Sequence, residues 1–229
     1  MFQISNLVAG YGQSMVIRDL SMQVAPAEIV AVLGRNGMGK TTLFKTLMGI
    51  LPARGGAVAV GEKNITVLET YERVANGIAY VPQGRMVFST LTVEENIRTG
   101  MRKRAGGAIP EEIYALFPVL FEMRRRKAGN LSGGQQQQLA IARALVTEPK
   151  VLLLDEPTEG IQPSIIKDIA RSLREIRKLK GLSIVVSEQV LSFALDVADR
   201  LLVIDKGKLV YETLREGADA QGIASYLAV

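Results

Sequence analysis

The sequence predicts an α/β fold with a mainly parallel sheet, a small antiparallel β subdomain near the N-terminus and an inserted helical subdomain. Three observations lead to this fold class. Apolar strand patterns alternate with helical patterns along most of the chain. A glycine-rich turn comes directly after the uninterrupted apolar run 29–33. Residues 85–130 interrupt the alternation, because they carry helical signals and no convincing strand.

The first elements are predicted to be strands. Residues 2–8, 16–24 and 57–60 alternate in polarity, carry β-branched side chains and are separated by glycines. The run 29–33 is typical of a parallel strand buried on both faces. Residues 41–48 then follow a helical pattern, so the glycine-rich turn is expected to join a strand to a helix.

The rest of the chain continues the same alternation. Buried strands are predicted at residues 78–81, 151–154, 183–186 and 201–204. Residues 164–180 carry apolar side chains at the helical period, and Gly181 suits a C-terminal cap. We therefore expect one domain, residues 1–229, with a core and β subdomain formed by 1–84 and 131–229 and a helical subdomain formed by 85–130.

Composition excludes several classes of protein. No run of about eighteen apolar residues is present, and the N-terminus lacks a signal-peptide pattern, so neither a membrane span nor secretion is expected. Without Cys there are no disulfides, which is compatible with the cytoplasm, and without His no mechanism can use an imidazole. The net charge of +5 suits nucleotide or membrane-surface partners, although a mildly basic protein without them is the simpler explanation.

The glycine-rich turn fits the phosphate-binding pattern G-x-x-x-x-G-K-[ST]. It consists of Gly34, Arg35, Asn36, Gly37, Met38, Gly39, Lys40 and Thr41. Glycines let successive amides converge on phosphate oxygens without obstruction by side chains. We expect Lys40 to reach the β and γ phosphates of ATP and the Thr41 hydroxyl to bind Mg²⁺. The alternative is an accidental match in a tight turn.

Two carboxylates follow the predicted strand 151–154. Ligands gather at the carboxyl ends of strands in open α/β sheets. We therefore expect Asp155 to hold Mg²⁺, directly or through water, and Glu156 to polarise the attacking water. A strand that simply ends in a charged turn is the alternative, and the phosphate loop argues against it.

A third motif precedes a predicted helix and consists of Leu131, Ser132, Gly133, Gly134 and Gln135. A Ser-Gly-Gly turn at a helix N-terminus offers a hydroxyl and several amides to an anion. We expect it to contact a terminal phosphate, and a flexible linker turn is the alternative.

Together the three motifs resemble the ATP-binding subunit of ABC transporters, and the resemblance covers essentially the whole chain. It implies two subunits arranged head to tail, with each ATP between the phosphate loop of one and Ser132–Gln135 of the other. The second subunit is expected to be a different chain, with a homodimer possible in isolation. Two permease subunits, an external substrate-binding protein and a peripheral place on the cytoplasmic face of the plasma (inner) membrane are also implied. No basic and aromatic surface predicts a nucleic-acid partner.

The same resemblance assigns roles to further residues. Tyr11 is similar to the aromatic residue that stacks on adenine, with a plain strand-end tyrosine as the alternative. Gln83 is similar to the glutamine that contacts Mg²⁺ or water and leads into the helical subdomain, with a surface loop glutamine as the alternative. Gln189 stands where many members have a His that senses the γ-phosphate. A glutamine can donate a hydrogen bond there but cannot carry the charge. In the loop after the two carboxylates, Gln162 stands at a position where an Asp is common in the family.

Within the family the chain resembles the uptake group for branched-chain amino acids, urea and short amides. This resemblance rests on Glu188 with Gln189, on the phosphate loop through Thr42 and on the run 91–96. The run 159–166 more resembles urea importers, so urea or short-chain amides are the first expectation. Branched-chain amino acids (Leu, Ile, Val) are the alternative. A soluble ABC-type nucleotide-binding regulator is the alternative of a different class, and intact Lys40, Asp155 and Glu156 argue against it.

Overall fold

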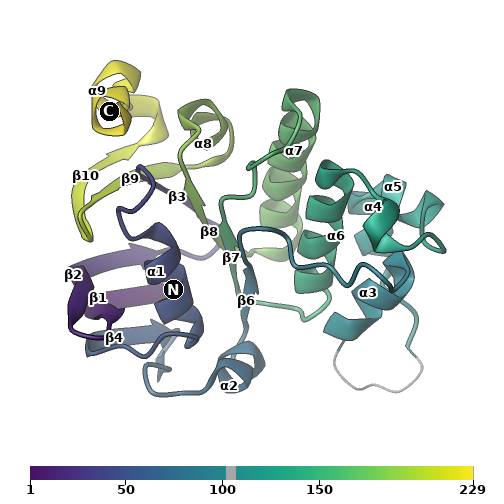
Figure 1. Cartoon of the computed structure of the whole chain (residues 1–229), viewed down its shortest axis with the longest axis horizontal. Helices are drawn as coiled ribbons and strands as arrows, with labels where there is room; N and C mark the ends of the chain where they lie inside the picture. The colour runs from purple at the N-terminus through teal and green to yellow at the C-terminus, as the bar shows by residue number, and fades with distance from the viewer. Residues whose placement is uncertain (102–106, 229) are drawn as a thin grey trace.

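The computed structural model describes residues 1–101 and 107–228 and contains two sheets with helices around them (Figure 1). The smaller sheet is antiparallel, with strand order β2-β1-β4-β5. Its strands are β1 (Phe2–Tyr11), β2 (Ser14–Val24), β4 (Gly55–Val60) and β5 (Lys63–Asn64). The expected N-terminal antiparallel sheet is confirmed, with β1 and β2 longer than predicted.

The larger sheet has six strands in the order β10-β9-β3-β8-β7-β6. All pairings are parallel except that of β9 with β10. The strands are β3 (Ile29–Leu33), β6 (Ile78–Val81), β7 (Val151–Asp155), β8 (Ser183–Glu188), β9 (Arg200–Asp205) and β10 (Lys208–Leu214). The mainly parallel sheet is thus confirmed, and β10 is a strand that the sequence did not predict.

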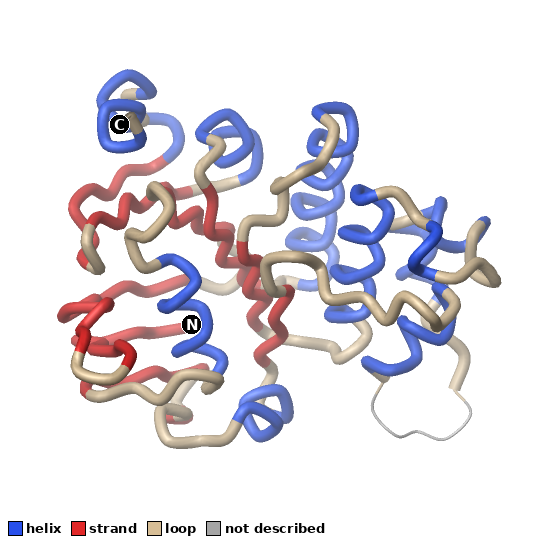
Figure 2. Tube along the Cα trace, in the orientation of Figure 1, coloured by secondary structure: helices blue, strands red, loops and turns tan. Residues whose placement is uncertain are grey.

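Helices cover both faces of this sheet (Figure 2). The helix α1 (Lys40–Met48) lies between the two sheets, and Val30 and Val32 of β3 face it in one core cluster. Ile29, Ala31 and Leu33 face the opposite cluster, to which α6 (Gly133–Leu145), α7 (Pro163–Lys180) and α8 (Leu191–Val197) contribute. The predicted cap at Gly181 is present, with φ of 60°. α2 (Thr70–Ala75) and α9 (Ala220–Leu227) complete this part.

The segment after β6 is helical and lies at the far end of the molecule from the antiparallel sheet (Figure 1). It contains α3 (Val93–Gly100), α4 (Glu111–Leu116), α5 (Pro118–Glu122) and a 3₁₀ turn (Ala128–Asn130). Residues 102–106 of the predicted helical subdomain lie outside the described residues. In the part of the chain that is described, no helix has the length and apolar character needed to span a membrane.

A buried arginine holds the C-terminal end of α1. The Arg73 guanidinium on α2 donates to the Thr46 and Leu47 carbonyls at 2.8 Å each. It also donates to the carbonyls of Leu68 (3.0 Å) and Thr66 (2.6 Å). The last carbonyls of a helix have no partner inside it, and a cation there is favourable. Arg73 therefore joins the C-terminal end of α1 to α2 and to the loop between β5 and α2.

We predict that Arg73→Met lowers the free energy of unfolding by at least about 2 kcal/mol, because several buried carbonyls lose a charged donor. Urea unfolding followed by circular dichroism measures the change. Arg171→Met is the matched control, since that side chain is 68% exposed, and it should change stability by less than about 0.5 kcal/mol. Equal effects of the two substitutions would show that Arg73 is not an anchor.

Candidate functional site

The predicted phosphate loop forms the turn between β3 and α1, at the carboxyl edge of the larger sheet. Gly37 and Gly39 have φ of 80° and 109°, a region that residues with a Cβ rarely adopt. A Cβ on Gly39 would also lie 3.0 Å from Cδ1 of Ile17. The first amides of α1 have no acceptor within the helix. The turn therefore offers an anion several amide donors at the positive end of a helix.

A pocket of about 350 Å³ opens at this turn. It is lined by Val16, Asn36, Gly37, Gly39, Lys40, Thr41, Thr42, Gln83 and Glu156. Gln83 follows β6 and Glu156 follows β7, so the parallel sheet brings side chains from distant parts of the sequence to the phosphate loop.

Lys40 and Glu156 form a buried ion pair in this pocket. The Lys40 Nζ lies 3.0 Å from Glu156 Oε1, and the two side chains are 3% and 7% exposed. The same ammonium donates to the carbonyls of Gly34 (2.6 Å) and Arg35 (3.0 Å). The charge of Lys40 is thus compensated at the mouth of the loop, where an anion would meet it.

Glu156 is also the meeting point of the two predicted glutamines. Gln189 Nε2 donates to both carboxylate oxygens of Glu156 at 3.3 Å, and to Asn36 Oδ1 at 2.9 Å. Gln83 Nε2 donates to Glu156 Oε2 at 3.4 Å. The structure therefore brings the three predicted catalytic side chains together, with Gln83 and Gln189 both donating to the Glu156 carboxylate.

Asp155 lies beside this cluster and is buried. Its carboxylate accepts hydrogen bonds from the hydroxyls of Ser187 (2.5 Å) and Tyr80 (3.1 Å). Burial raises the pKa of Asp155, against the opposing effect of these hydrogen bonds. Burial is the largest cause that raises the pKa of Tyr80, and the neighbouring Asp155 carboxylate raises it further. The Thr41 hydroxyl lies close enough to lower the pKa of Asp155, so the two predicted metal ligands are near each other.

The donors at this place suit a hard cation. A hydroxyl, a carboxylate and an amide side chain, from Thr41, Asp155 and Gln83, are oxygen ligands of the kind that Mg²⁺ takes. Among the described residues no three acidic, His or Cys side chains cluster as a metal cage. Mg²⁺ characteristically binds through one or two carboxylates plus substrate phosphates. The residues therefore fit a cation shared with a bound nucleotide.

The third predicted motif lies elsewhere, at the start of α6. The Ser132 hydroxyl accepts a hydrogen bond from the backbone N–H of Gln135 (3.3 Å), and Gln135 Oε1 accepts one from the backbone N–H of Ser132 (2.9 Å). A Cβ on Gly134 would lie 2.4 Å from Cγ2 of Ile165 on α7, so α6 and α7 require a glycine here. Neither Ser132, Gly133, Gly134 nor Gln135 lines the Lys40 pocket. This chain does not bring its two anion-binding turns together.

Other predicted ligands have positions of their own. Tyr11 ends β1, is half exposed and does not line the pocket. Arg35 donates to the Ala228 carbonyl after α9 (3.1 Å), and so turns away from the pocket. The Met38 carbonyl accepts from the Gly207 amide (3.0 Å) in the β9–β10 turn. Met38 and Arg35 thus support the loop from outside the pocket.

Sequence reasoning missed two residues that shape the site. Ser187 on β8 bonds Asp155, as above, and its hydroxyl and carbonyl each accept the Glu156 amide at 3.1 Å. Glu188 joins the loops after β7 and β8. Both directly follow the predicted strand 183–186, and a polar pair at the carboxyl end of a buried strand was the available signal.

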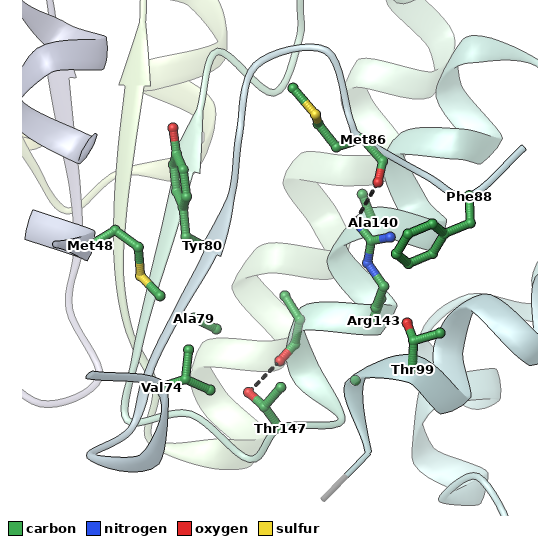
Figure 3. Close-up of a pocket in the computed structure, with 12 residues that line it drawn as sticks. Met48, Val74, Ala79, Tyr80, Met86, Phe88, Thr99, Ala140, Arg143 and Thr147 are labelled. Atoms are coloured by element: carbon green, nitrogen blue, oxygen red, sulfur yellow. Dashed lines mark hydrogen bonds between the residues drawn. The ribbon is translucent and has the colours of Figure 1, made fainter. Parts of the chain in front are cut away.

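A larger, mostly apolar cavity of about 500 Å³ lies between the core and the helical segment (Figure 3). Met48, Val74, Tyr80 and Thr147 come from the core side, and Met86, Phe88 and Thr99 from the loop after β6 and α3. Arg143 of α6 donates to the Met86 carbonyl (2.8 Å), and its guanidinium lies 5.2 Å from the centre of the Phe88 ring. Phe88 and Met86, which are 50% and 67% exposed, thus form one wall of the cavity.

Comparison with known proteins decides the family. The sequence profile of the ABC transporter family matches residues 17–159, a range that contains the phosphate loop, the Ser132 turn and both carboxylates. The chain belongs to the ABC transporter family. It is an ATP-binding cassette of that family and an ATPase, and its α/β fold is that of the ABC cassette.

Two relatives cover most of this ABC cassette. The high-affinity branched-chain amino acid transport ATP-binding protein BraG of Pseudomonas aeruginosa is 38% identical over 92% of this chain and 91% of its own length. The probable branched-chain amino acid transport ATP-binding protein LivF of Archaeoglobus fulgidus is 36% identical over the same shares. A nucleotide-free ATP-binding cassette from an ABC transporter superimposes with a TM-score of 0.84, at 28% identity, over 98% of this chain and 95% of that one.

Proposed function

We propose that this cassette hydrolyses ATP to power an importer of branched-chain amino acids. The observation that carries the proposal is the similarity to BraG and LivF over nine-tenths of both chains. The first expectation, urea or short-chain amides, loses ground, because neither relative is named for urea. The lipopolysaccharide export system ATP-binding protein LptB of Escherichia coli also matches, at 32% identity over 90% of this chain, so family membership alone does not select the cargo.

In this proposal Lys40 and the amides of the phosphate loop bind the β and γ phosphates of ATP. Thr41, Asp155 and Gln83 hold Mg²⁺, which when bound neutralises phosphate charge. Glu156 accepts a proton from the attacking water, and its position is supported by the hydrogen bonds from Gln83 and Gln189. Gln189 then acts as the sensor of the γ-phosphate, because its amide donates to Asn36 and Glu156, which both line the pocket, while Gln189 itself lies just outside the lining.

A second cassette would complete the site. The Ser132 turn lies away from this chain's own pocket, and ABC cassettes generally form dimers, so we propose that it binds the ATP held by a partner. The partner is a different ATP-binding subunit or a second copy. Tyr11, exposed at the tip of β1, would stack on adenine once the nucleotide is bound.

The apolar cavity in Figure 3 is the proposed docking place for a permease helix. It is open between the core and the helical segment, and Phe88 and Met86 offer exposed apolar surface there. This assembly would hold the chain on the cytoplasmic face of the membrane, below two permease subunits and an external substrate-binding protein. A regulator that does not hydrolyse ATP fits poorly, because the Lys40–Glu156 pair and Asp155 are all in place.

The proposed roles predict a graded loss of ATP turnover in the assembled importer. Glu156→Gln should lower kcat more than about 100-fold, because the general base is lost, while ATP binding persists. Gln189→Ala should lower kcat about tenfold, the effect of one hydrogen bond to a charged group. A steady-state phosphate-release assay measures both. Wild-type turnover no higher than that of Glu156→Gln would contradict the hydrolytic role, and an unchanged Gln189→Ala would remove the sensor role.

Docking at the cavity predicts different effects for two phenylalanines of similar exposure, Phe88 at 50% and Phe121 at 49%. Phe88→Ala should weaken co-purification with the permease subunits of the proposed importer at least about tenfold, as expected for an aromatic anchor that becomes buried on docking. Phe121→Ala should not, because Phe121 lies outside the cavity. Quantified pull-down of the permease, with both variants checked by circular dichroism, decides between them. Equal retention of the permease would exclude this docking place.

The cargo is tested by reconstituting the full importer, with its permeases and binding protein, in proteoliposomes. Leucine should raise ATP turnover above the basal rate, whereas urea at the same saturation should leave it at the basal rate. Glu156→Gln in the same vesicles gives the background that is subtracted. Stimulation by urea and not by leucine would contradict the proposal and favour a urea importer.

A further inference from the structure

Glu188 is a buried carboxylate at the last position of β8, only 2% exposed. Its Oε1 accepts from the Thr158 amide (3.0 Å) and from the Thr158 hydroxyl (2.7 Å). Its Oε2 accepts from the amides of Gln189 (3.0 Å) and Val190 (3.3 Å). One oxygen therefore serves the loop after β7, and the other serves the loop after β8.

A carboxylate removed from water is costly unless hydrogen bonds replace its hydration. Burial raises the pKa of Glu188, while the hydrogen bonds from Thr158, Gln189 and Val190 oppose that rise. Separation of the two loops would leave one oxygen of Glu188 buried without donors. The contact is thus a strong constraint on their relative position.

Both loops carry residues of the hydrolytic site. Glu156 precedes Thr158 by two positions, and Gln189 directly follows Glu188. Gln189 Nε2 reaches both oxygens of Glu156 only while the loops keep this spacing. On the far side, Gln83 and Arg85 hold Glu159 through its carboxylate (3.0 Å) and its carbonyl (2.8 Å).

We propose that Glu188 is a positioning residue for ATP hydrolysis, which sets the distance between Glu156 and Gln189 by joining the loops after β7 and β8 through Thr158. The inference rests on the proposed roles of Glu156 and Gln189. It concerns the turnover step, because Glu188 does not line the pocket that receives the nucleotide.

Thr158→Val tests the contact with little change of shape, because it removes only the hydroxyl donor. In the assembled importer it should lower kcat about tenfold and leave the KM for ATP within about twofold. Thr158→Ser restores the hydroxyl and should restore kcat. Glu188→Gln replaces one accepting oxygen by an NH₂ group, which then faces N–H or O–H donors and cannot accept from them. It should lower kcat at least as far as Thr158→Val.

The control is Ser183→Ala at the opposite end of β8. Its hydroxyl donates to the Ala25 carbonyl (2.8 Å) and, like that of Thr158, belongs to a buried residue, but it lies away from the site. It should cost stability and leave kcat unchanged. A loss of kcat in Ser183→Ala equal to that in Thr158→Val would overturn the proposal.

Hydrogen–deuterium exchange of the purified full-length chain gives a readout that is independent of turnover. Thr158→Val and Glu188→Gln should accelerate exchange in peptides that cover residues 156–162 and 188–192, and leave residues 34–42 unchanged. Unchanged exchange at both loops, or a weaker binding of a fluorescent ATP analogue in place of a lower kcat, overturns the inference. If Glu188→Gln does not fold, Thr158→Val decides alone. An inactive wild-type importer refutes the proposed function, while the exchange data still judge this contact.

Discussion

The buried ion pair between Lys40 and Glu156 joins loops from β3 and β7, two strands that are not neighbours in the sheet. β8 runs between them, so the residues that end β8 lie beside both partners of the pair. This explains why Gln189 donates to Asn36 on one side and to Glu156 on the other. The contacts of the site depend on that strand order, since a buried charge keeps its position only while its partner does.

The loop after β6 connects the nucleotide pocket to the apolar cavity. Gly84, Arg85 and Met86 have consecutive positive φ angles of 80°, 66° and 50°, which is strained for the two residues that carry a Cβ. Two hydrogen bonds stabilise this strained backbone, one from Arg85 to the Glu159 carbonyl and one from Arg143 to the Met86 carbonyl. Movement of the Glu159 backbone therefore alters a contact that supports the wall of the cavity. The loop is the shortest covalent path between the two places.

Local pattern was enough to predict the strands that are buried on both faces, because β3 and β6 consist of apolar residues throughout. It failed for β10, whose alternating exposure is a weaker signal, and for β5, which has only two residues. The phosphate loop and the two carboxylates were predictable because their chemistry requires fixed spacings. Glu188 was recognised only as a mark of resemblance. Its contact with Thr158 spans thirty positions and exists only after β7 and β8 pair.

The run 159–166 led to the first expectation about the cargo, and the structure shows what its residues contact. Glu159 is held by Gln83 and Arg85, and Gln162 begins α7 as its N-cap. Ile165 packs against Gly134 in the Ser132 turn. All of these contacts lie within the chain, so similarity in this run reflects how the cassette is assembled. Similarity over the whole chain also includes residues that line the apolar cavity, and for that reason the likeness to BraG and LivF carries more weight in the proposal for the cargo.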